Sequence, residues 1–131
     1  INNGKALNKF EEIIKAQNAD ISSLQSEDLR PKHEIIINSH KSGFIKSLKT
    51  EQIGWSLVEM GCGRKVEKDE LDYSAGIEFL NKMGDKIKKG EPIFRIFGND
   101  LEKLNSAKKM LKKTYTLTDL DITKPKSIIT V

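Results

Sequence analysis

The sequence predicts an α+β domain of short, mixed or antiparallel strands with two packing helices, preceded by one further helix. Apolar residues recur every three to four positions in three segments, which is typical of amphipathic helices. Short β-branched runs such as residues 34–38 alternate with turn residues, which is typical of strands. The chain has 131 residues, of which 37% are hydrophobic. This length and composition support one modest hydrophobic core.

The N-terminal segment, residues 1–19, is expected to be a helix that belongs to whatever precedes the domain. Leu7, Phe10 and Ile14 share one face of a helix over residues 5–17. Residues 20–32 show no periodicity and end in Arg30-Pro31, so they are expected to be a linker. Because the first residue is Ile1 rather than Met, the chain is expected to be a piece of something longer.

Residues 33–131 are expected to form the α+β domain, in the order β-β-α-β-β-β-α-β. The expected strands cover residues 34–38, 43–48, 77–83, a short stretch at Ile87, 92–97 and an edge strand at 128–131. A helix is expected from Thr50, its N-cap, to Gly61, its stop. Residues 61–76 contain glycines and many charges, which predicts an ordered loop.

The second helix of this domain is expected to begin at Asn99. Glu102 follows three residues later, close to the spacing of a capping box. The core face of this helix is expected to contain Leu101, Leu104, Met110 or Leu111, and Tyr115.

The net charge of +4 does not by itself predict a nucleic-acid-binding protein. Only Arg30, Arg64 and Arg95 are arginines among the 23 basic residues, whereas base reading favours arginine. The charge is also segregated, since residues 51–80 carry a net −4 and residues 82–113 a net +6. A lysine-rich solvated face is the favoured interpretation, and a lysine-rich nucleic-acid-binding domain is an alternative.

No catalytic, cofactor or metal site is expected in this chain. Cys62 is the single cysteine and only two histidines occur, His33 and His40, which excludes an internal disulfide and a Cys-based zinc site. Cys62 is expected to be a small buried thiol beside the end of a helix. Gly61 and Gly63 precede Arg64 without the Lys-Ser/Thr ending of a phosphate loop.

The remaining candidates for catalysis or binding, the loop carboxylates and two aromatic residues, are expected to have structural roles. The carboxylates between Glu67 and Asp72 alternate with lysines, as they do in solvated loops. Trp55 and Tyr73 are expected in a core or an interface. Apolar runs do not exceed three residues, so neither a membrane-spanning helix nor a signal peptide is expected. A reduced, cytoplasmic location is the default expectation.

Two stretches resemble biotinyl and lipoyl carrier domains, which are barrel-sandwich structures. Residues 83–94 are similar to their turn-strand-turn, and residues 40–48 resemble the segment that pairs with it. A carrier places its acceptor lysine at the tip of the next hairpin, where this chain has Gly98-Asn99-Asp100. The resemblance therefore implies the scaffold without the carrier function, and a prosthetic-group carrier is the second alternative.

A longer resemblance, to the C-terminal part of pyrimidine nucleoside phosphorylases of the thymidine phosphorylase family, covers nearly the whole chain. Its ordered landmarks lie at residues 4–10, 42–45, 61–64, 69–77 and 84–92. The run from Asp72 to Ile77, Asp-Tyr-Ser-Ala-Gly-Ile, is the part that favours this family over the related archaeal AMP phosphorylases. Cys62 departs from the pattern, because alanine or glycine is more usual there.

The resemblance implies a β-hammerhead domain, related to barrel-sandwich hybrids, that completes the larger of two lobes. The helix in residues 1–19 would then end the preceding α/β domain. The parent enzyme would cleave a pyrimidine nucleoside with phosphate, a co-substrate bound by upstream domains, and would form a homodimer through its helical lobe. The fragment itself would contain no catalytic residue and bind neither nucleic acid nor membrane.

One mechanistic role is expected within the fragment. The loop from Gly61 to Gly76 has glycines at both ends, and the resemblance places it beside the cleft between the lobes. Arg64 is expected to anchor the loop by pairing with Asp72 or with a carboxylate upstream. The candidate cleft-closing residues are Gly61, Gly63, Arg64, Asp72, Tyr73 and Ser74. The alternative is that the loop only caps the preceding helix and covers core.

Overall fold

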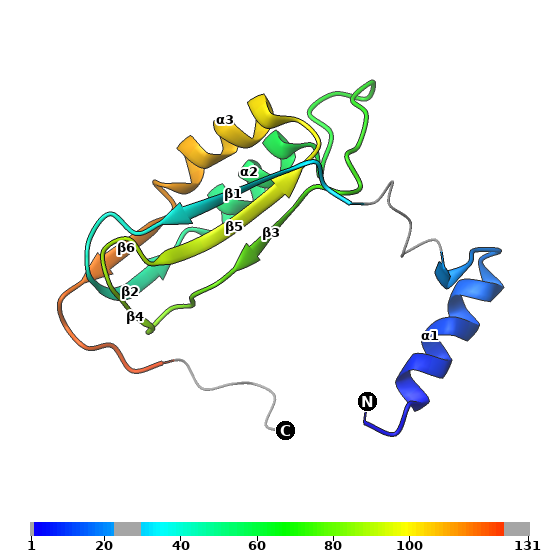
Figure 1. The fold of residues 1–131 in the computed structure, drawn as a ribbon, viewed down its shortest axis with the longest axis horizontal. Helices are drawn as coiled ribbons and strands as arrows, with labels where there is room; N and C mark the ends of the chain where they lie inside the picture. The colour runs from blue at the N-terminus through cyan, green and yellow to red at the C-terminus, as the bar shows by residue number, and fades with distance from the viewer. Residues whose placement is uncertain (1, 23–29, 125–131) are drawn as a thin grey trace. The chain divides into compact units, whose positions relative to one another are not determined.

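The computed structural model describes residues 2–22 and 30–124 (Figure 1). The chain divides into two compact units, Ile1–Arg30 and Pro31–Val131. The expected α+β class is confirmed, because three helices and two small antiparallel sheets make up the described residues. None of the described helices has the length and apolar character needed to cross a bilayer.

Helix α1 (Lys5–Ala16) lies in the first unit and confirms the helix expected near residues 5–17. No residue of α1 is buried. Its apolar side chains remain open to solvent, with Leu7 56%, Phe10 47% and Ile13 49% exposed. An amphipathic helix gains most of its stability by burying such a face. Within residues 2–22 and Arg30, the described part of this unit, nothing buries the apolar face of α1.

Two three-stranded antiparallel sheets organise the second unit. The first sheet has the order β1-β5-β3, with β1 (His33–Asn38), β5 (Pro92–Gly98) and β3 (Gly76–Phe79). The second has the order β4-β2-β6, with β4 (Lys86–Ile87), β2 (Gly43–Leu48) and β6 (Tyr115–Thr118). Ile96 of the central strand β5 pairs with Ile35 on one side and Ile77 on the other. This register directs apolar side chains of all three strands to one face.

Helices α2 (Thr50–Met60) and α3 (Leu101–Leu111) pack against each other and beside the first sheet (Figure 1). Each contributes a buried stripe at helical spacing, and the stripes meet the apolar face of the sheet. The buried apolar residues are Ile37, Ile45, Ile53, Met60, Ile87, Ile93, Phe94, Ile96, Leu104, Ala107, Leu111 and Tyr115.

Several element boundaries differ from expectation. The N-cap of α2 is Lys49 rather than Thr50. The N-cap of α3 is Asp100, not Asn99, because the Asp100 carboxylate accepts hydrogen bonds from the backbone nitrogens of Glu102 and Lys103. The strand expected at 77–83 ends at Phe79, and Leu101 is exposed rather than part of the core face.

The strand β6 was not predicted. Tyr115 lies four residues after Leu111, so its spacing favoured a longer helix, but the helix ends at Leu111 and Tyr115 begins the strand. Its ring is buried and contacts Phe94 edge to face. The edge strand expected at 128–131 lies outside the described residues.

Candidate functional site: the loop between α2 and β3

The candidate loop begins where Gly61 ends helix α2. Gly61 has φ 98°, a left-handed conformation that glycine adopts without strain. Its backbone nitrogen donates to Val58 O, and the nitrogen of Cys62 donates to Leu57 O, so two of the last four carbonyls of the helix are satisfied. The expected stop at Gly61 is confirmed. A Cβ at this position would lie 3.3 Å from Cβ of Asp72, so the two ends of the loop touch here.

Asp72 is the centre of the hydrogen bonding at the base of the loop. Its Oδ1 accepts from the backbone nitrogen of Ser74 at 3.0 Å and from the Ser74 hydroxyl at 2.6 Å. Its carboxylate also accepts from the backbone nitrogen of Asn99 at 2.7 Å and from Asn99 Nδ2 at 3.0 Å. The backbone nitrogen of Asp72 donates to Gly61 O at 2.9 Å. One residue therefore joins the end of α2, the end of the loop and the β5–α3 turn.

The electrostatics of Asp72 follow from these contacts. Partial burial alone would raise the pKa of its carboxyl. The hydrogen bonds from Ser74 and Asn99 favour the charged form and outweigh burial, so the pKa lies below its ordinary value of 3.8. Asp72 is thus an ionised structural acceptor, not an acid poised to donate a proton near neutral pH.

Glycines let the backbone segments around Asp72 approach closely. A Cβ at Gly98 would lie 3.2 Å from Oδ2 of Asp72 and 3.1 Å from Cβ of Ala75. A Cβ at Gly76 would lie 2.8 Å from the ring of Phe97, and one at Gly63 would lie 3.0 Å from Val58 Cγ2. The glycines therefore serve close packing here, so the base of the loop is fixed.

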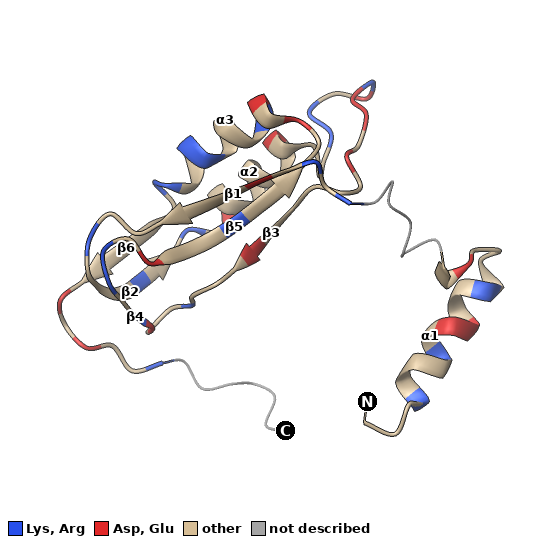
Figure 2. Cartoon of the chain, in the orientation of Figure 1, with Lys and Arg blue, Asp and Glu red and all other residues tan. Residues whose placement is uncertain are grey.

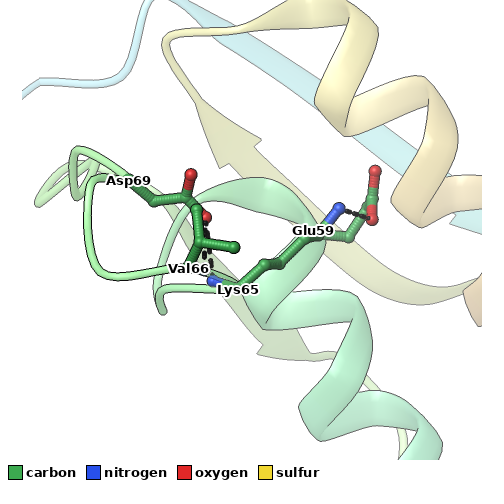
Figure 3. A network of polar contacts seen from close by, with 4 residues as sticks. All are labelled: Glu59, Lys65, Val66 and Asp69. Carbon is green, nitrogen blue, oxygen red and sulfur yellow. Dashed lines mark hydrogen bonds and ion pairs between the residues drawn. The ribbon is translucent and has the colours of Figure 1, made fainter.

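The tip of the loop has its own polar network (Figure 3). Oδ2 of Asp69 accepts from the backbone nitrogens of Lys65 at 2.8 Å and Val66 at 3.1 Å. The ammonium of Lys65 pairs with the carboxylate of Glu59 on α2. These hydrogen bonds lower the pKa of Asp69 below its ordinary value. Together with Lys103, these side chains border a shallow pocket of about 200 Å³.

Arg64 does not pair with Asp72, so that half of the expected anchor is wrong. The Asp72 side chain accepts its hydrogen bonds from Ser74 and Asn99. Among residues 2–22 and 30–124, Arg64 makes no ion pair, and its side chain is exposed. These neutral donors lie in the two turns that adjoin Asp72. Pairing of Arg64 with a carboxylate outside this chain stays a prediction.

Two apolar side chains of the loop project into solvent. Tyr73 is 80% exposed and Val66 is 61% exposed. Tyr73 was expected in a core or an interface, and within the described residues it is not in the core. Ser74, by contrast, is buried and donates to Asp72. The site residues therefore separate into a fixed base, formed by Gly61, Asp72 and Ser74, and an exposed part with Arg64 and Tyr73.

Cys62 is exposed, so the expectation of a buried thiol is wrong. Cys62 directly follows Gly61, the C-cap of α2. Shielding by neighbouring atoms, and then the negative charge of Asp72, raise the pKa of the Cys62 thiol above its ordinary value. This environment disfavours the thiolate, which is the nucleophilic form of cysteine.

Asn99 is the functional residue of this site that sequence reasoning missed. It was assigned to cap α3, but it occupies the turn before the cap and binds Asp72 with both its backbone and its side chain. The available signal was Gly98-Asn99, a turn pair that follows a strand. The turn leads directly into α3 rather than into a hairpin, and no lysine is in it.

The described side chains offer little reactive chemistry. No group of three or more His, Cys, Asp or Glu residues among them could hold a metal ion. Two carboxylates of the loop serve as structural acceptors, Asp69 for backbone amides at the tip and Asp72 for Ser74 and Asn99 at the base. The arrangement positions and shapes a surface loop, and it does not assemble a nucleophile with a base.

Comparison with known proteins identifies a matching family. The family model described as the pyrimidine nucleoside phosphorylase C-terminal domain matches residues 44–118. This range contains both ends of the candidate loop, Asn99 and the described helices and strands of the second unit, apart from β1 and the first residue of β2.

Curated relatives extend the match. A pyrimidine-nucleoside phosphorylase of Bacillus subtilis is 33% identical over 99 residues, which cover 74% of this chain and 23% of that protein. One from Staphylococcus haemolyticus is 35% identical over 101 residues, covering 76% and 23%. One from Staphylococcus aureus strain USA300 is 31% identical over 121 residues, covering 91% and 28%. The chain thus spans about a quarter of the length of these relatives.

A solved structure described as a nicotinate-nucleotide pyrophosphorylase from Francisella tularensis aligns with 77% of this chain and 33% of its own. Its TM-score is 0.40 and its sequence identity is 12%. A likeness at this level supports no statement about the chain.

Proposed function

The chain belongs to the family of pyrimidine nucleoside phosphorylase C-terminal domains, and from this premise we propose that residues 33–131 are the C-terminal domain of such an enzyme. The observation that carries the proposal is the combination of a match over residues 44–118 with coverage of only 23% of the Bacillus subtilis relative. The parent enzyme would convert a pyrimidine nucleoside and phosphate into the free base and a ribose or deoxyribose 1-phosphate.

Within that enzyme this domain is proposed to be non-catalytic. Cleavage through an oxocarbenium-like state requires phosphate close to the anomeric carbon and a stabilised leaving base. The described residues provide no such groups, and those groups are assigned to upstream domains. The domain would complete the larger lobe, while the helical lobe would form a homodimer in the cytoplasm. The upstream α and α/β domains would be its partners.

Helix α1 is proposed to be the end of the preceding α/β domain. Its apolar face, with Leu7, Phe10 and Ile13, is exposed in the unit that contains it. Burial of this face against the upstream domain would provide the stabilisation that the isolated helix lacks. Residues 20–32 would then be the linker to the α+β domain.

The second unit is proposed to be a β-hammerhead related to barrel-sandwich hybrids. The two segments that resemble the carrier scaffold lie side by side, since Gly43 pairs with Ile87 and Phe44 with Lys86. Further backbone hydrogen bonds join Ser39 with Glu91 and Gly90. The carrier function itself is not favoured, because Gly98-Asn99-Asp100 opens a helix where a carrier presents its lysine on a hairpin.

The loop from Gly61 to Gly76 is proposed to help close the cleft between the lobes. Its base is fixed by Asp72, while Arg64 and Tyr73 are exposed and free to contact an opposing surface. A loop of this kind excludes water during bond cleavage without contributing a reacting group. Arg64 would pair with a carboxylate of another domain.

The proposal is tested by comparing this chain with the full-length enzyme in phosphorolysis of thymidine and uridine. Full-length enzyme should release free base in a phosphate-dependent manner, and purified residues 1–131 should give no turnover above a blank. Turnover that increases with the concentration of residues 1–131 would overturn the non-catalytic role. A full-length enzyme that releases no base from either nucleoside would overturn the assigned reaction.

A further inference from the structure

An apolar pocket lies between helices α2 and α3, apart from the loop site. Gln52, Trp55, Met110 and Lys113 line it, and its volume is about 300 Å³. Trp55 is 59% exposed, so its ring is a solvent-facing wall of this pocket rather than part of the core. A large aromatic surface left in water is a common mark of a binding site.

The surroundings of this pocket are basic. Four lysines, Lys108, Lys109, Lys112 and Lys113, lie at the C-terminal end of α3, where Figure 2 shows the helix in blue. The backbone nitrogen of Lys49 donates to Thr114 O, which places the start of α2 beside them. Within the described part of the chain, no ion pair engages any of these five lysines. Their positive charge is therefore available to a partner.

We propose that this pocket binds an acidic protein segment that inserts one aliphatic or aromatic side chain between Trp55 and Met110. The pocket is large enough to receive one large side chain, and contact with Trp55 and Met110 would remove much of that side chain from water. Carboxylates on either side of the anchor would pair with Lys113, which lines the pocket, and with Lys109 in the last turn of α3. This inference goes beyond the proposed phosphorolysis and does not depend on it.

Charge and shape favour an acidic polypeptide over other polyanions. Single-stranded nucleic acids bind where several aromatic rings stack on successive bases, and the lining of this pocket has one ring, that of Trp55. An anionic bilayer binds a broad apolar face, whereas the apolar lining here is limited to Trp55 and Met110.

The test uses Trp55, because it is the single tryptophan of the chain and reports directly on the pocket. Residues 1–131 are titrated with the blocked peptide Glu-Glu-Leu-Phe-Glu-Glu, and tryptophan emission is followed. The expected result is a saturable change of emission that weakens as salt is added. The double variant Lys109→Glu/Lys113→Glu should bind at least about tenfold more weakly, which corresponds to a loss of about 1.4 kcal/mol.

The matched control is Lys88→Glu/Lys89→Glu, which reverses two exposed lysines in the turn between β4 and β5. It should bind the peptide within about twofold of the wild type, and thermal melting should show that both variants are folded. The proposal is overturned if the acidic peptide gives no saturable change, or if Lys-Lys-Leu-Phe-Lys-Lys binds as well. Saturation by an oligothymidylate or by phosphatidylserine vesicles, without a response to the acidic peptide, would also overturn it.

Discussion

The carboxylate of Asp72 accepts hydrogen bonds from both the backbone nitrogen and the side-chain amide of Asn99. These residues belong to two different turns, one at the end of the candidate loop and one between β5 and α3. Their contact holds the base of the loop against the turn that leads into α3. Any movement of the loop is therefore expected in residues 62–71, between Gly61 and Asp72.

Removing the Asp72 carboxylate should destabilise the domain. Asp72→Ala leaves the donors of Ser74 and Asn99 without their charged acceptor, and hydrogen bonds to charged groups contribute about 1.5–3 kcal/mol. Because Asp72 is partly exposed, we expect a loss of about 2 kcal/mol in urea unfolding. Glu67→Ala, an exposed loop carboxylate, is the control and should change stability by less than about 0.5 kcal/mol. Equal effects of the two substitutions would contradict the central role of Asp72.

The contribution of Asp72 should depend on pH in a defined direction. Its pKa is lowered from 3.8 because the hydrogen bonds from Ser74 and Asn99 outweigh partial burial. A lowered carboxyl pKa stabilises the folded state above 3.8, and this stabilisation is lost as the pH falls through the folded pKa. The difference in unfolding free energy between wild type and Asp72→Asn should be constant from pH 5 to 7, within about 0.3 kcal/mol, and should narrow below pH 3.8. A difference independent of pH would argue against this linkage.

Substitution by alanine should have opposite effects on stability at Gly54, in the middle of α2, and at Gly61, its C-cap. Gly61 has φ 98°, and an added Cβ would lie 3.3 Å from Cβ of Asp72, so Gly61→Ala should destabilise by about 1–2 kcal/mol. Gly54 lies inside the helix with nothing within 4 Å of its added Cβ. Gly54→Ala should therefore stabilise by about 0.5–1 kcal/mol. Melting temperatures of the two variants check the prediction, and shifts of the same sign would refute it.

Substitutions of Asp100 should reveal how much the N-cap of α3 contributes to the stability of the domain. Its carboxylate accepts from two backbone nitrogens in the first turn of the helix. Asp100→Ala should cost about 1 kcal/mol of stability, while Asp100→Ser or Asp100→Asn should restore most of it. Asp119→Ala, at an exposed position after β6, provides the comparison and should be nearly neutral. Failure of Asn or Ser to restore stability would mean that Asp100 acts through something other than the cap.

In the full-length enzyme, Arg64→Ala should separate the gating role of the loop from a structural one. Arg64 is exposed and makes no ion pair among the described residues, so its removal should leave the melting temperature within about 1 °C of wild type. A closing role predicts a fall of kcat of about tenfold, with Lys68→Ala as the matched basic control. Unchanged kcat and KM in Arg64→Ala would leave the loop with only its structural role.

Regular periodicity made most of the fold predictable. The positions of α1, α2, β1, β2 and β5 follow from apolar spacing and from turn residues such as Gly61, and they lie within a few residues of expectation. The prediction fails where the spacing of apolar residues is compatible with both a helix and a strand. Tyr115 continues the helical spacing of Leu111, yet tertiary contact with Phe94 places it in β6.

The candidate site was predicted in outline but not in its contacts. The loop could be located from composition, because clustered glycines and charged residues are typical of loops and can be recognised in the sequence itself. The hydrogen-bond partner Asn99 could not be predicted from the residues around Asp72, because it lies far along the chain. The pairing of Gly76 with Phe97 brings it near Asp72. Opposite charge favoured Arg64 as the partner of Asp72, whereas in the structure the uncharged amide of Asn99 donates to this carboxylate.

Both sheets are completed by segments that are synthesised late. Strand β5, which occupies the centre of the first sheet, ends at Gly98, and β6 of the second sheet ends at Thr118. A nascent chain that has left the ribosome only up to Gly90 therefore exposes β1 and β3 with no strand to join them. Folding of this domain must wait for nearly its whole length and then proceed through distant contacts, which slows it relative to helical domains. During translation, the unpaired β1 is a site where chaperones or aggregation compete with folding.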